Sequence, residues 1–216
     1  MKIDRDMEYP RTKILVFCKA PEPGKVKTRL QGALSAAQCA HLHVALARWA
    51  LQTASDSGLG ETELWCAGDL GHPFFKECAQ RYGVALRQQQ GPDLGARMAD
   101  ALQSALLSAA SAIIIGTDCP GLDKTYLQQA AAFIENGGPA ARVIIGPATD
   151  GGYVLFGANS AVGEAFKNIA WGSDKVLQQT RDRLHNLNIP YRELETLWDV
   201  DRPEDLQRLP AWLNIF

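Results

Sequence analysis

The sequence lacks the features that mark several common classes of protein. It carries 22 basic and 24 acidic side chains, so neither sign dominates in the way that nucleic acid or a membrane surface would require. Its longest run of apolar residues and serine, at residues 104–115, is too short to span a membrane. The first twelve residues are charged and show no targeting pattern. We therefore expect a cytoplasmic protein of enzyme size, with no nucleic-acid partner and no membrane span.

Cysteine and histidine pairs with metal-binding spacing are also absent from the sequence. The five cysteines are odd in number and form no C-x-x-C pair, which favours reduced thiols over disulfides or a zinc site. His41 and His43 lie two apart in an expected helix and face different ways. Cys119 adjoins Asp118, whose carboxylate would raise the thiol pKa and suppress the reactive thiolate. Thiol and zinc chemistry are thus disfavoured.

Strand-like and helical segments alternate along the chain. The apolar residues of the helical segments recur at helical spacing, whereas the strand-like runs are short and rich in branched side chains. This alternation predicts an α/β fold with a mostly parallel central sheet covered by helices on both faces. At this length we expect a single domain over residues 13–216, preceded by a loosely held extension over residues 1–12. The expected helices are 35–55, 74–81, 94–109, 124–135 and 174–186, and the expected strands are 13–17, 63–66, 84–87, 111–115 and 142–146.

A basic loop follows the first expected strand, in the string CKAPEPGKVKTRL at residues 18–30. Its prolines and glycine stiffen and bend the backbone, so that backbone N–H groups and several cationic side chains converge on an anion. A Walker loop is excluded, because Lys19 stands where glycine is needed and Val26 where a hydroxyl is needed. The alternative is a solvated surface turn. We assign phosphate binding to Gly24, Lys25, Lys27, Thr28 and Arg29.

A carboxylate stands where the branched strand at residues 111–115 opens into a loop. Asp118 would project from the carboxyl end of that strand, where open α/β sheets bind their ligands, and Gly116 would let a ligand approach closely. Together with the phosphate-binding loop this predicts that Asp118 binds a bridging cation. The alternative is an aspartate that caps the next helix, but Asp123 is better placed for that, immediately before residue 124.

Two further acidic segments complete the candidate site. Asp150 precedes paired glycines and a tyrosine, which could form the floor and wall of a substrate pocket, although Asp-Gly also makes hairpin turns. Asp199 and Asp201 alternate, so an extended chain places both on one face, although Asp201 could instead cap the helix that follows. A loop near residue 95 could lie at the nucleotide edge or simply begin a helix. The residues assigned here are Gly151, Gly152 and Tyr153 for the substrate pocket, and Gly95, Arg97 and Gly116 for the nucleotide.

The ordered set of motifs resembles the radical-SAM/selenodomain-associated transferase family, within the GT-A-like nucleotide-diphospho-sugar transferase superfamily. The strings that carry the resemblance are PEPGKVKTRL, GTDCPGL, DGGY and DVDRPEDL, and it extends over residues 13–209. It implies a Rossmann-type α/β/α sandwich, nucleotide binding at the strand ends and Mg²⁺ or Mn²⁺ near Asp118. Members of the family are often labelled glycosyltransferases.

Two departures keep the reaction type open. Glycosyltransferases of this fold typically carry Asp-x-Asp, whereas here Gly116 and Pro120 flank Asp118 at two residues on either side. A lone strand-end aspartate joined by a distant C-terminal one is closer to nucleotidyltransferases such as molybdenum-cofactor guanylyltransferase and 2-phospholactate guanylyltransferase. Against this, the opening loop lacks the glycine-rich string with which most nucleotidyltransferases hold a triphosphate.

The expected reaction is transfer from a nucleotide-diphospho-sugar to a small-molecule acceptor. Asp118 and Asp201 would hold Mg²⁺ or Mn²⁺, while Lys27 and its basic neighbours neutralise the leaving phosphate and Asp150 acts as a base toward the acceptor. One alternative is nucleotidyl transfer from a nucleoside triphosphate with release of pyrophosphate. A second is a nucleotide-binding regulator that retains the fold without catalysis.

Overall fold

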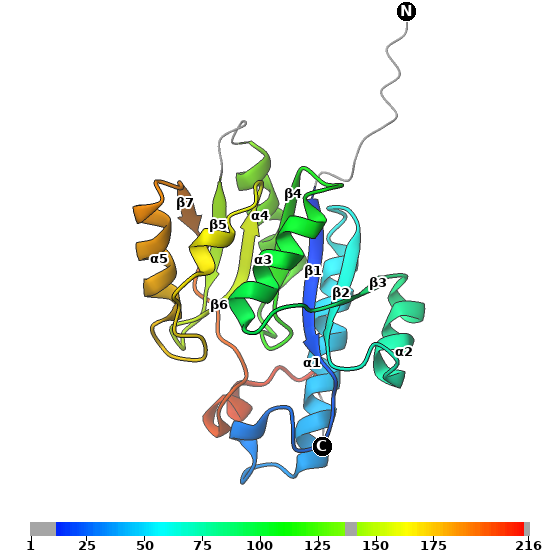
Figure 1. Ribbon diagram of the computed structural model, residues 1–216. Coiled ribbons are helices and arrows are strands. Elements are labelled where there is room, and N and C mark those ends of the chain that lie inside the picture. The colour runs from blue at the N-terminus through cyan, green and yellow to red at the C-terminus, as the bar shows by residue number, and fades with distance from the viewer. Residues whose placement is uncertain (1–11, 137–141, 214–216) are drawn as a thin grey trace, which may run out of the picture.

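A seven-stranded sheet lies at the centre of the computed structural model, which describes residues 12–136 and 142–213 (Figure 1). The strand order is β3-β2-β1-β4-β6-β5-β7. β6 runs antiparallel to both of its neighbours, and the other neighbouring strands are parallel, so the predicted mostly parallel sheet is confirmed. The strands are β1 (Thr12–Lys19), β2 (Thr62–Ala67), β3 (Ala85–Gln88), β4 (Ser111–Ile115), β5 (Val143–Pro147), β6 (Tyr153–Ala158) and β7 (Tyr191–Glu193).

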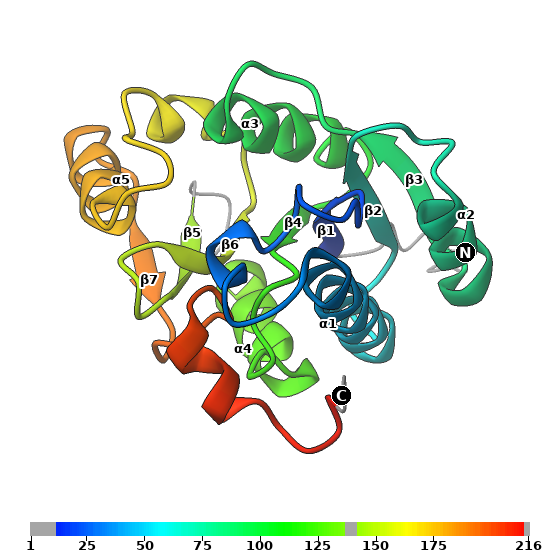
Figure 2. The same ribbon diagram turned by 90° about the horizontal axis from the view of Figure 1, so that it is seen from below.

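Helices cover both faces of this sheet, as the alternating sequence pattern predicts (Figure 2). One face packs against α1 (Ala36–Asp56), α2 (Pro73–Tyr82) and α4 (Lys124–Glu135). The other packs against α3 (Leu94–Ala105), α5 (Val176–Asn186) and the 3₁₀ turn η2 (Gly163–Phe166). Two further 3₁₀ turns are η1 (Thr28–Leu30) and η3 (Pro203–Arg208). The chain is therefore an α/β/α sandwich.

Polar side chains fix where the long helices begin. Ser35 forms a reciprocal capping box with Gln38 at the start of α1. The carboxylates of Asp93 and Asp123 accept hydrogen bonds of 2.8 Å from backbone N–H groups in the first turns of α3 and α4. Because Asp123 caps α4, Asp118 is left free for another role, as the sequence predicts.

The alternating side chains of β1 divide the core into two halves. Ile14 and Val16 are buried on the side of α1 and α4, and Leu15 is buried on the side of α3. All five residues of β4 are buried, so the centre of the sheet is apolar on both faces. Such a core holds the strand ends rigidly in place.

The observed elements differ from the predicted ones mainly at their ends. The expected helix at residues 94–109 ends at Ala105, and the helix expected after Pro203 is a 3₁₀ turn. The strand β6 was expected only as a glycine-rich substrate segment. Of the expected N-terminal extension, Thr12 is the first residue of β1, and residues 1–11 lie outside the described residues. None of the helices within the described residues is long and apolar enough to cross a membrane.

Candidate functional site

The basic loop after β1 lies at the carboxyl edge of the sheet, beside the C-terminal segment (Figures 1 and 2). Gly24 has φ 84°, a conformation that favours glycine, and it closes a turn in which the Lys25 N–H donates to the Glu22 carbonyl at 3.0 Å. Val26 and Leu30 are buried and anchor the loop to the body of the protein. The segment that carries Lys27, Thr28 and Arg29 is therefore anchored on both sides.

The three predicted phosphate-binding cations differ in their environments. Lys25 is exposed and pairs with Glu22 at 2.5 Å. The side chain of Lys27 is only 3% exposed. Its ammonium contacts Asp118 Oδ1 at 2.6 Å and donates to the Val200 carbonyl at 2.5 Å. Arg29 is 58% exposed and pairs with Asp201 Oδ2 at 2.5 Å. Arg29 and Lys25 can thus turn toward a ligand more readily than Lys27 can.

Lys27 also has an unusual backbone conformation. Its φ is 50°, in the left-handed region that a residue with a side chain seldom adopts. This conformation directs the chain into η1 while the side chain reaches back to Asp118 and Val200. Backbone strain of this kind gathers at functional sites, because the surrounding contacts must hold it in place.

Asp118 lies just beyond the end of β4, where the sequence predicts it. Burial raises the pKa of this carboxyl, but the ammonium of Lys27 and the nearby His43 and Lys19 outweigh burial and hold the pKa below its ordinary value. The side chain is 49% exposed, and Lys27 contacts its Oδ1. Oδ2 of Asp118 has no hydrogen-bond or ion-pair partner in the part of the chain that the structure describes. Asp118 is thus ionised, with one oxygen open to a ligand.

His43 on α1 is a site residue that the sequence interpretation missed. Its ring is buried; Nε2 lies 2.9 Å from the Lys19 carbonyl, which can only accept a hydrogen bond, so Nε2 carries the proton. Burial lowers the pKa of His43 despite the nearby Asp118, which lies 3.9 Å from Nδ1. A neutral imidazole therefore supports the end of β1. Its only sequence signal is a polar residue on the apolar face of α1.

The C-terminal segment brings Asp199 and Asp201 to the same edge of the sheet. Val200 is fully buried between them, and its N–H donates to the Asp118 carbonyl at 2.8 Å. Burial, with Asp150 as the next cause and Asp118 and Asp201 contributing, raises the pKa of Asp199 to about 6. This shift marks a concentration of negative charge. The alternative in which Asp201 caps the following turn is not observed, since its side chain pairs with Arg29.

Two adjoining cavities open at this edge. The basic compartment, of about 530 Å³, is lined by Lys19, Lys25, Lys27, Thr28, Arg29, His43 and Arg97 among others. The acidic compartment, of about 300 Å³, is lined by Asp150, Gly152, Tyr153, Trp171, Asp174, Asp199 and Arg202 among others. Five residues line both cavities, namely Arg29, Leu94, Gly116, Asp118 and Asp201. The site therefore has two connected halves of opposite charge.

Gly116 keeps the two compartments connected. A Cβ atom at this position would meet no other atom within 4 Å, so it would project into the open space of the site. The backbone N–H of Gly116 donates to the Val154 carbonyl on β6 at 3.2 Å, which fixes the strand end. The missing side chain leaves room for a ligand beside Asp118.

Three other glycines that the sequence assigns to the site, Gly24, Gly95 and Gly151, lie outside both linings, whereas Gly152 lines the acidic compartment. Gly95 is buried in α3, where a Cβ atom would lie 2.7 Å from Trp171 Cζ2 and 2.8 Å from the Phe166 carbonyl. Gly151 has φ 88° and lies against the backbone of Asp174. The structure thus gives Gly95 and Gly151 packing roles, in place of the predicted contacts with nucleotide and substrate. Gly24 serves the turn described above.

The donor atoms at the junction suit a hard cation bound together with phosphate. Asp118 and Asp201 offer carboxylate oxygens, and each has one oxygen paired with a cationic side chain and one oxygen unpaired among the described residues. No group of three or more His, Cys, Asp or Glu side chains in residues 12–136 and 142–213 forms a preassembled metal cage. Mg²⁺ commonly binds through one or two carboxylates, with phosphate oxygens and water completing its shell. The residues present fit that type of site.

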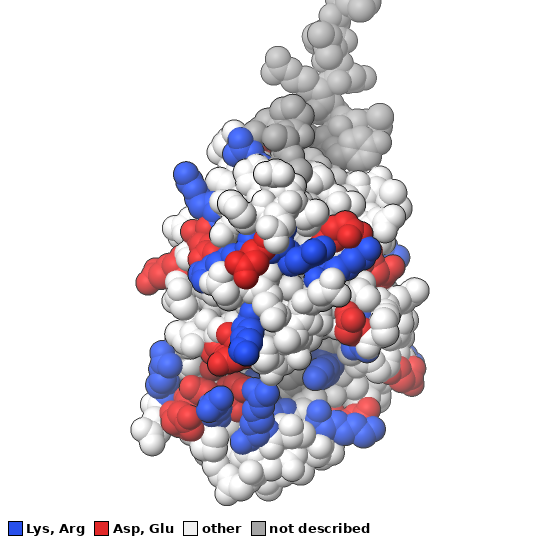
Figure 3. Space-filling model, turned by 60° about the vertical axis from the view of Figure 1, so that its left-hand side comes forward, with Lys and Arg blue, Asp and Glu red and all other residues white. Residues whose placement is uncertain are grey.

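The charge on the face shown in Figure 3 is mixed. On the face that Figure 3 shows, Lys and Arg side chains lie among Asp and Glu side chains, and neither sign covers the face. The separation of charge inside the site is therefore a local feature, made by the loop after β1 and the acidic segments that meet it.

Comparison with known proteins establishes the family. Residues 50–173, more than half of the chain, match the family described as "Uncharacterized protein conserved in bacteria (DUF2064)". The chain belongs to this DUF2064 family. No curated protein matches the sequence significantly. A solved structure of a candidate nucleotide-diphospho-sugar transferase from Desulfovibrio desulfuricans G20 is 30% identical, with a TM-score of 0.79 over 88% of this chain and 82% of that one.

More distant structures share the fold of this DUF2064 protein. A cytidylyltransferase from Leptospira borgpetersenii is 14% identical, with a TM-score of 0.64 over 95% of this chain and 87% of that one. Glucosyl-3-phosphoglycerate synthase from Mycobacterium tuberculosis, solved with Mn²⁺ and uridine diphosphate, is 11% identical, with a TM-score of 0.54 over 92% and 75%. The GT-A-like α/β/α fold predicted from the sequence is thereby confirmed.

Proposed function

We propose that this protein is a metal-dependent glycosyltransferase that uses a nucleotide-diphospho-sugar donor. The observation that carries the proposal is the pair of connected compartments of opposite charge, which meet at Asp118 on the carboxyl edge of the sheet. A transferase needs one place for a donor and another for an acceptor, with the reacting atoms at their junction. The relative from Desulfovibrio desulfuricans, described as a candidate nucleotide-diphospho-sugar transferase, supports this choice.

The donor would occupy the basic compartment. Lys25 and Arg29 are exposed there and can exchange their partners Glu22 and Asp201 for phosphate oxygens. Lys27 and Thr28 contribute further donors from the same loop, and Arg97 reaches the compartment from α3. These cations would stabilise the negative charge that grows on the diphosphate as it leaves.

Asp118 and Asp201 would hold Mg²⁺ or Mn²⁺ through their open oxygens. When bound, the ion would supply electrostatic stabilisation of the leaving diphosphate. Before a donor binds, Lys27 pairs with Asp118 and Arg29 pairs with Asp201, and both carboxylates line the two compartments. This proposal agrees with the Mn²⁺ in the structure of glucosyl-3-phosphoglycerate synthase, which shares the fold.

The acceptor would occupy the acidic compartment. Asp150 lines it, and its Oδ1 accepts the Gly152 N–H at 2.8 Å, which fixes the carboxylate while Oδ2 stays available. From there Asp150 can take the proton of an acceptor hydroxyl. Tyr153 forms part of the wall, and burial raises the pKa of its hydroxyl, which therefore stays protonated.

One observation favours nucleotidyl transfer as a second candidate. Three cations of one short loop, Lys25, Lys27 and Arg29, line the basic compartment, and they match the three phosphates of a nucleoside triphosphate as well as the two of a nucleotide sugar. In that reaction the acceptor attacks the α-phosphate and pyrophosphate leaves, with the same carboxylates at the junction.

We extend the proposal to the rest of the protein. Residues 13–216 would form one GT-A-like domain, which acts in the cytoplasm as a member of the radical-SAM/selenodomain-associated transferase group. All five cysteines are free and buried in the structure, as suits a protein with reduced thiols.

Thermal shift with matched pairs of nucleotides tests the proposed function. Each nucleotide sugar and its parent triphosphate are added with and without Mg²⁺ or Mn²⁺, because a ligand that binds the folded state raises the melting temperature. We expect a larger, metal-dependent shift with a nucleotide sugar. A larger shift with the triphosphate would select nucleotidyl transfer, and equal shifts without any metal dependence or turnover would indicate a nucleotide-binding regulator.

A further inference from the structure

The acidic compartment has a chemistry of its own, which defines what it can bind. We propose that it receives an uncharged polyhydroxylated acceptor, a sugar or sugar alcohol, and that it disfavours acceptors carrying phosphate or carboxylate. The inference rests on the proposed transferase function, because it names the class of the second substrate at the same site. It concerns only the half of the site that faces away from the basic loop.

The hydrogen-bonding groups of this compartment are mostly acceptors. Asp150, Asp174 and Asp199 line it, and ionised carboxylates can only accept hydrogen bonds. Ser173 adds little, since its hydroxyl already donates to the Ala170 carbonyl at 2.7 Å. A ligand that fills the compartment must therefore donate several hydrogen bonds, as hydroxyl groups do and phosphate oxygens do not.

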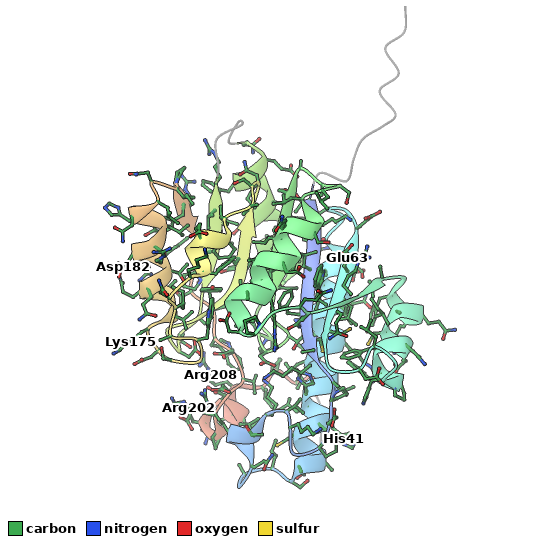
Figure 4. All side chains as sticks on the ribbon, in the orientation of Figure 1. His41, Glu63, Lys175, Asp182, Arg202 and Arg208 are labelled. Carbon is green, nitrogen blue, oxygen red and sulfur yellow. The ribbon has the colours of Figure 1, made fainter. Side chains whose placement is uncertain are left out.

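The balance of charge points the same way. Arg29 is paired with Asp201, and Asp118 with Lys27, so these four side chains contribute little net charge. The rest of the lining retains three aspartates against Arg202, which stands at the start of η3 (Figure 4). A divalent cation at the junction would be balanced by the phosphates of the donor. An anionic acceptor would thus meet an excess of like charge.

The presence of Arg202 also favours hydroxyl groups over ammonium groups. A hydroxyl both donates and accepts, so it satisfies a carboxylate and a guanidinium at once, whereas an ammonium group can only donate. Arg202 and the aspartates line the same compartment. A molecule with several hydroxyl groups suits both kinds of side chain.

An aromatic wall completes the compartment. Tyr153 and Trp171 meet edge to face, with ring centroids 6.3 Å apart, and both line the cavity. The indole of Trp171 packs closely against Gly95, where an added Cβ atom would lie 2.7 Å from its Cζ2. These rings offer an apolar surface for the C–H face of a sugar or polyol.

The proposed transfer step forms one bond, breaks one bond and moves one proton. An acceptor hydroxyl oxygen forms the new bond to the anomeric carbon of the donor sugar. The bond from that carbon to the diphosphate breaks, and its electron pair leaves with the nucleoside diphosphate. The hydroxyl proton passes to Asp150, which lines the acceptor compartment.

Ligand-observed NMR on the full chain with matched probes tests the inference without requiring turnover. The probes are glucose against glucose 6-phosphate, and sorbitol against sorbitol 6-phosphate. With a saturating nucleoside diphosphate in the basic compartment, we expect saturation transfer to the neutral member of each pair, and binding of its phosphorylated counterpart weaker by about tenfold or more, because like charges repel. Stronger binding of the phosphorylated member in both pairs would overturn the inference.

A charge-reversal variant with a matched control sharpens the test. Asp174→Lys replaces an exposed side chain of the lining, so the fold should persist, and it should bring the affinity for the phosphorylated probes up to that for the neutral ones or above it. Asp182→Lys makes the same change on α5, outside the lining (Figure 4), and should leave the preference unchanged. An identical effect of both variants, or none from Asp174→Lys, would contradict the inference.

The thermal shift with nucleotides is measured on the same samples, so the two proposals can fail separately. If nucleotides bind but no neutral probe does, the assignment of the acceptor is wrong and the donor site stands. If neither nucleotides nor probes bind, the transferase function itself fails.

Discussion

The ammonium of Lys27 lies 2.6 Å from Oδ1 of Asp118 and joins the loop after β1 to the end of β4. The same ammonium donates to the carbonyl of Val200, so three segments distant in sequence meet at one nitrogen. The sequence assigns Lys27 to phosphate binding. In the structure its side chain is buried directly against Asp118, where it stabilises the ionised carboxylate.

We expect Lys27→Ala to destabilise the fold and the site together. The substitution leaves Asp118 and the Val200 carbonyl without their shared donor, and hydrogen bonds to charged groups contribute about 1.5–3 kcal/mol. Because Asp118 is half-exposed, the loss should lie toward the lower end of that range. Urea unfolding, followed by circular dichroism, measures the change in the free energy of unfolding.

Lys25→Ala provides the matched control for this prediction. It removes a lysine from the same loop, but Lys25 is exposed and pairs with the exposed Glu22 of its own turn. Exposed ion pairs of this kind contribute about 0–1 kcal/mol. Equal losses of stability in the two variants would show that Lys27 is an ordinary surface lysine.

The ordered motifs allowed the fold and the location of the site to be predicted. Asp118 follows a strand whose run of isoleucines can only be buried, and parallel strands place their carboxyl ends at one edge, so its meeting with the basic loop follows from local patterns. The cap of α4 by Asp123 could also be predicted from a local pattern, because an aspartate directly before a helical segment is a common helix cap.

The partners inside the site could not be predicted in the same way. The pairing of Arg29 with Asp201, and the burial of His43 beneath Lys19, depend on contacts between distant segments that no local pattern specifies. The sequence places Gly95 in a loop that could lie at the nucleotide edge or begin a helix. Its real neighbour, Trp171, comes from a loop far along the chain.

We expect Arg29→Ala to weaken nucleotide binding about tenfold or more while changing stability little. Arg29 is 58% exposed, so its pair with Asp201 contributes no more than about 1 kcal/mol to folding, but its planar fork suits phosphate oxygens. Arg48→Ala is the matched control, because Arg48 makes a comparable exposed pair with Glu77. Isothermal titration calorimetry with the nucleotide selected by thermal shift checks both. Unchanged affinity with a large fall in melting temperature would make Arg29 a structural residue.

We expect Asp118→Asn to abolish most metal-dependent turnover. The substitution keeps the shape of the side chain but removes the negative charge that a hard cation requires, and a loss of about 100-fold or more is typical for a principal electrostatic group. Cys119→Ser should be mild, because burial raises the pKa of Cys119 to about 12 and the thiol stays protonated. Turnover is measured as release of nucleoside diphosphate, with a chelator as a further control. Full activity of Asp118→Asn would contradict the metal assignment.

We expect Gly95→Ala to displace Trp171 and destabilise the fold by about 1–3 kcal/mol, as overpacking of a core commonly does. The added Cβ would lie 2.7 Å from Trp171 Cζ2 and 2.8 Å from the Phe166 carbonyl, and neither can move freely. Gly163→Ala is the control, since its Cβ would meet Ala99 at an ordinary 3.4 Å. Thermal unfolding and tryptophan fluorescence report the two effects. A silent Gly95→Ala would mean that the indole has more freedom than its contacts indicate.

The raised pKa of Asp199 predicts a specific dependence of stability on pH. Burial and the carboxylate of Asp150 raise this pKa from 3.8 to about 6, so the folded state holds the proton more tightly than the unfolded state does. The free energy of unfolding should therefore fall as the pH rises from about 4 to 6, and Asp199→Asn should remove that part of the fall. At pH 7 the variant should be more stable than the wild type by about 1–2 kcal/mol, after allowance for partial exposure to solvent. Denaturant unfolding at several pH values measures both curves. Parallel curves for Asp199→Asn and the wild type across this range would show that the pKa of Asp199 is the same in the folded and unfolded states.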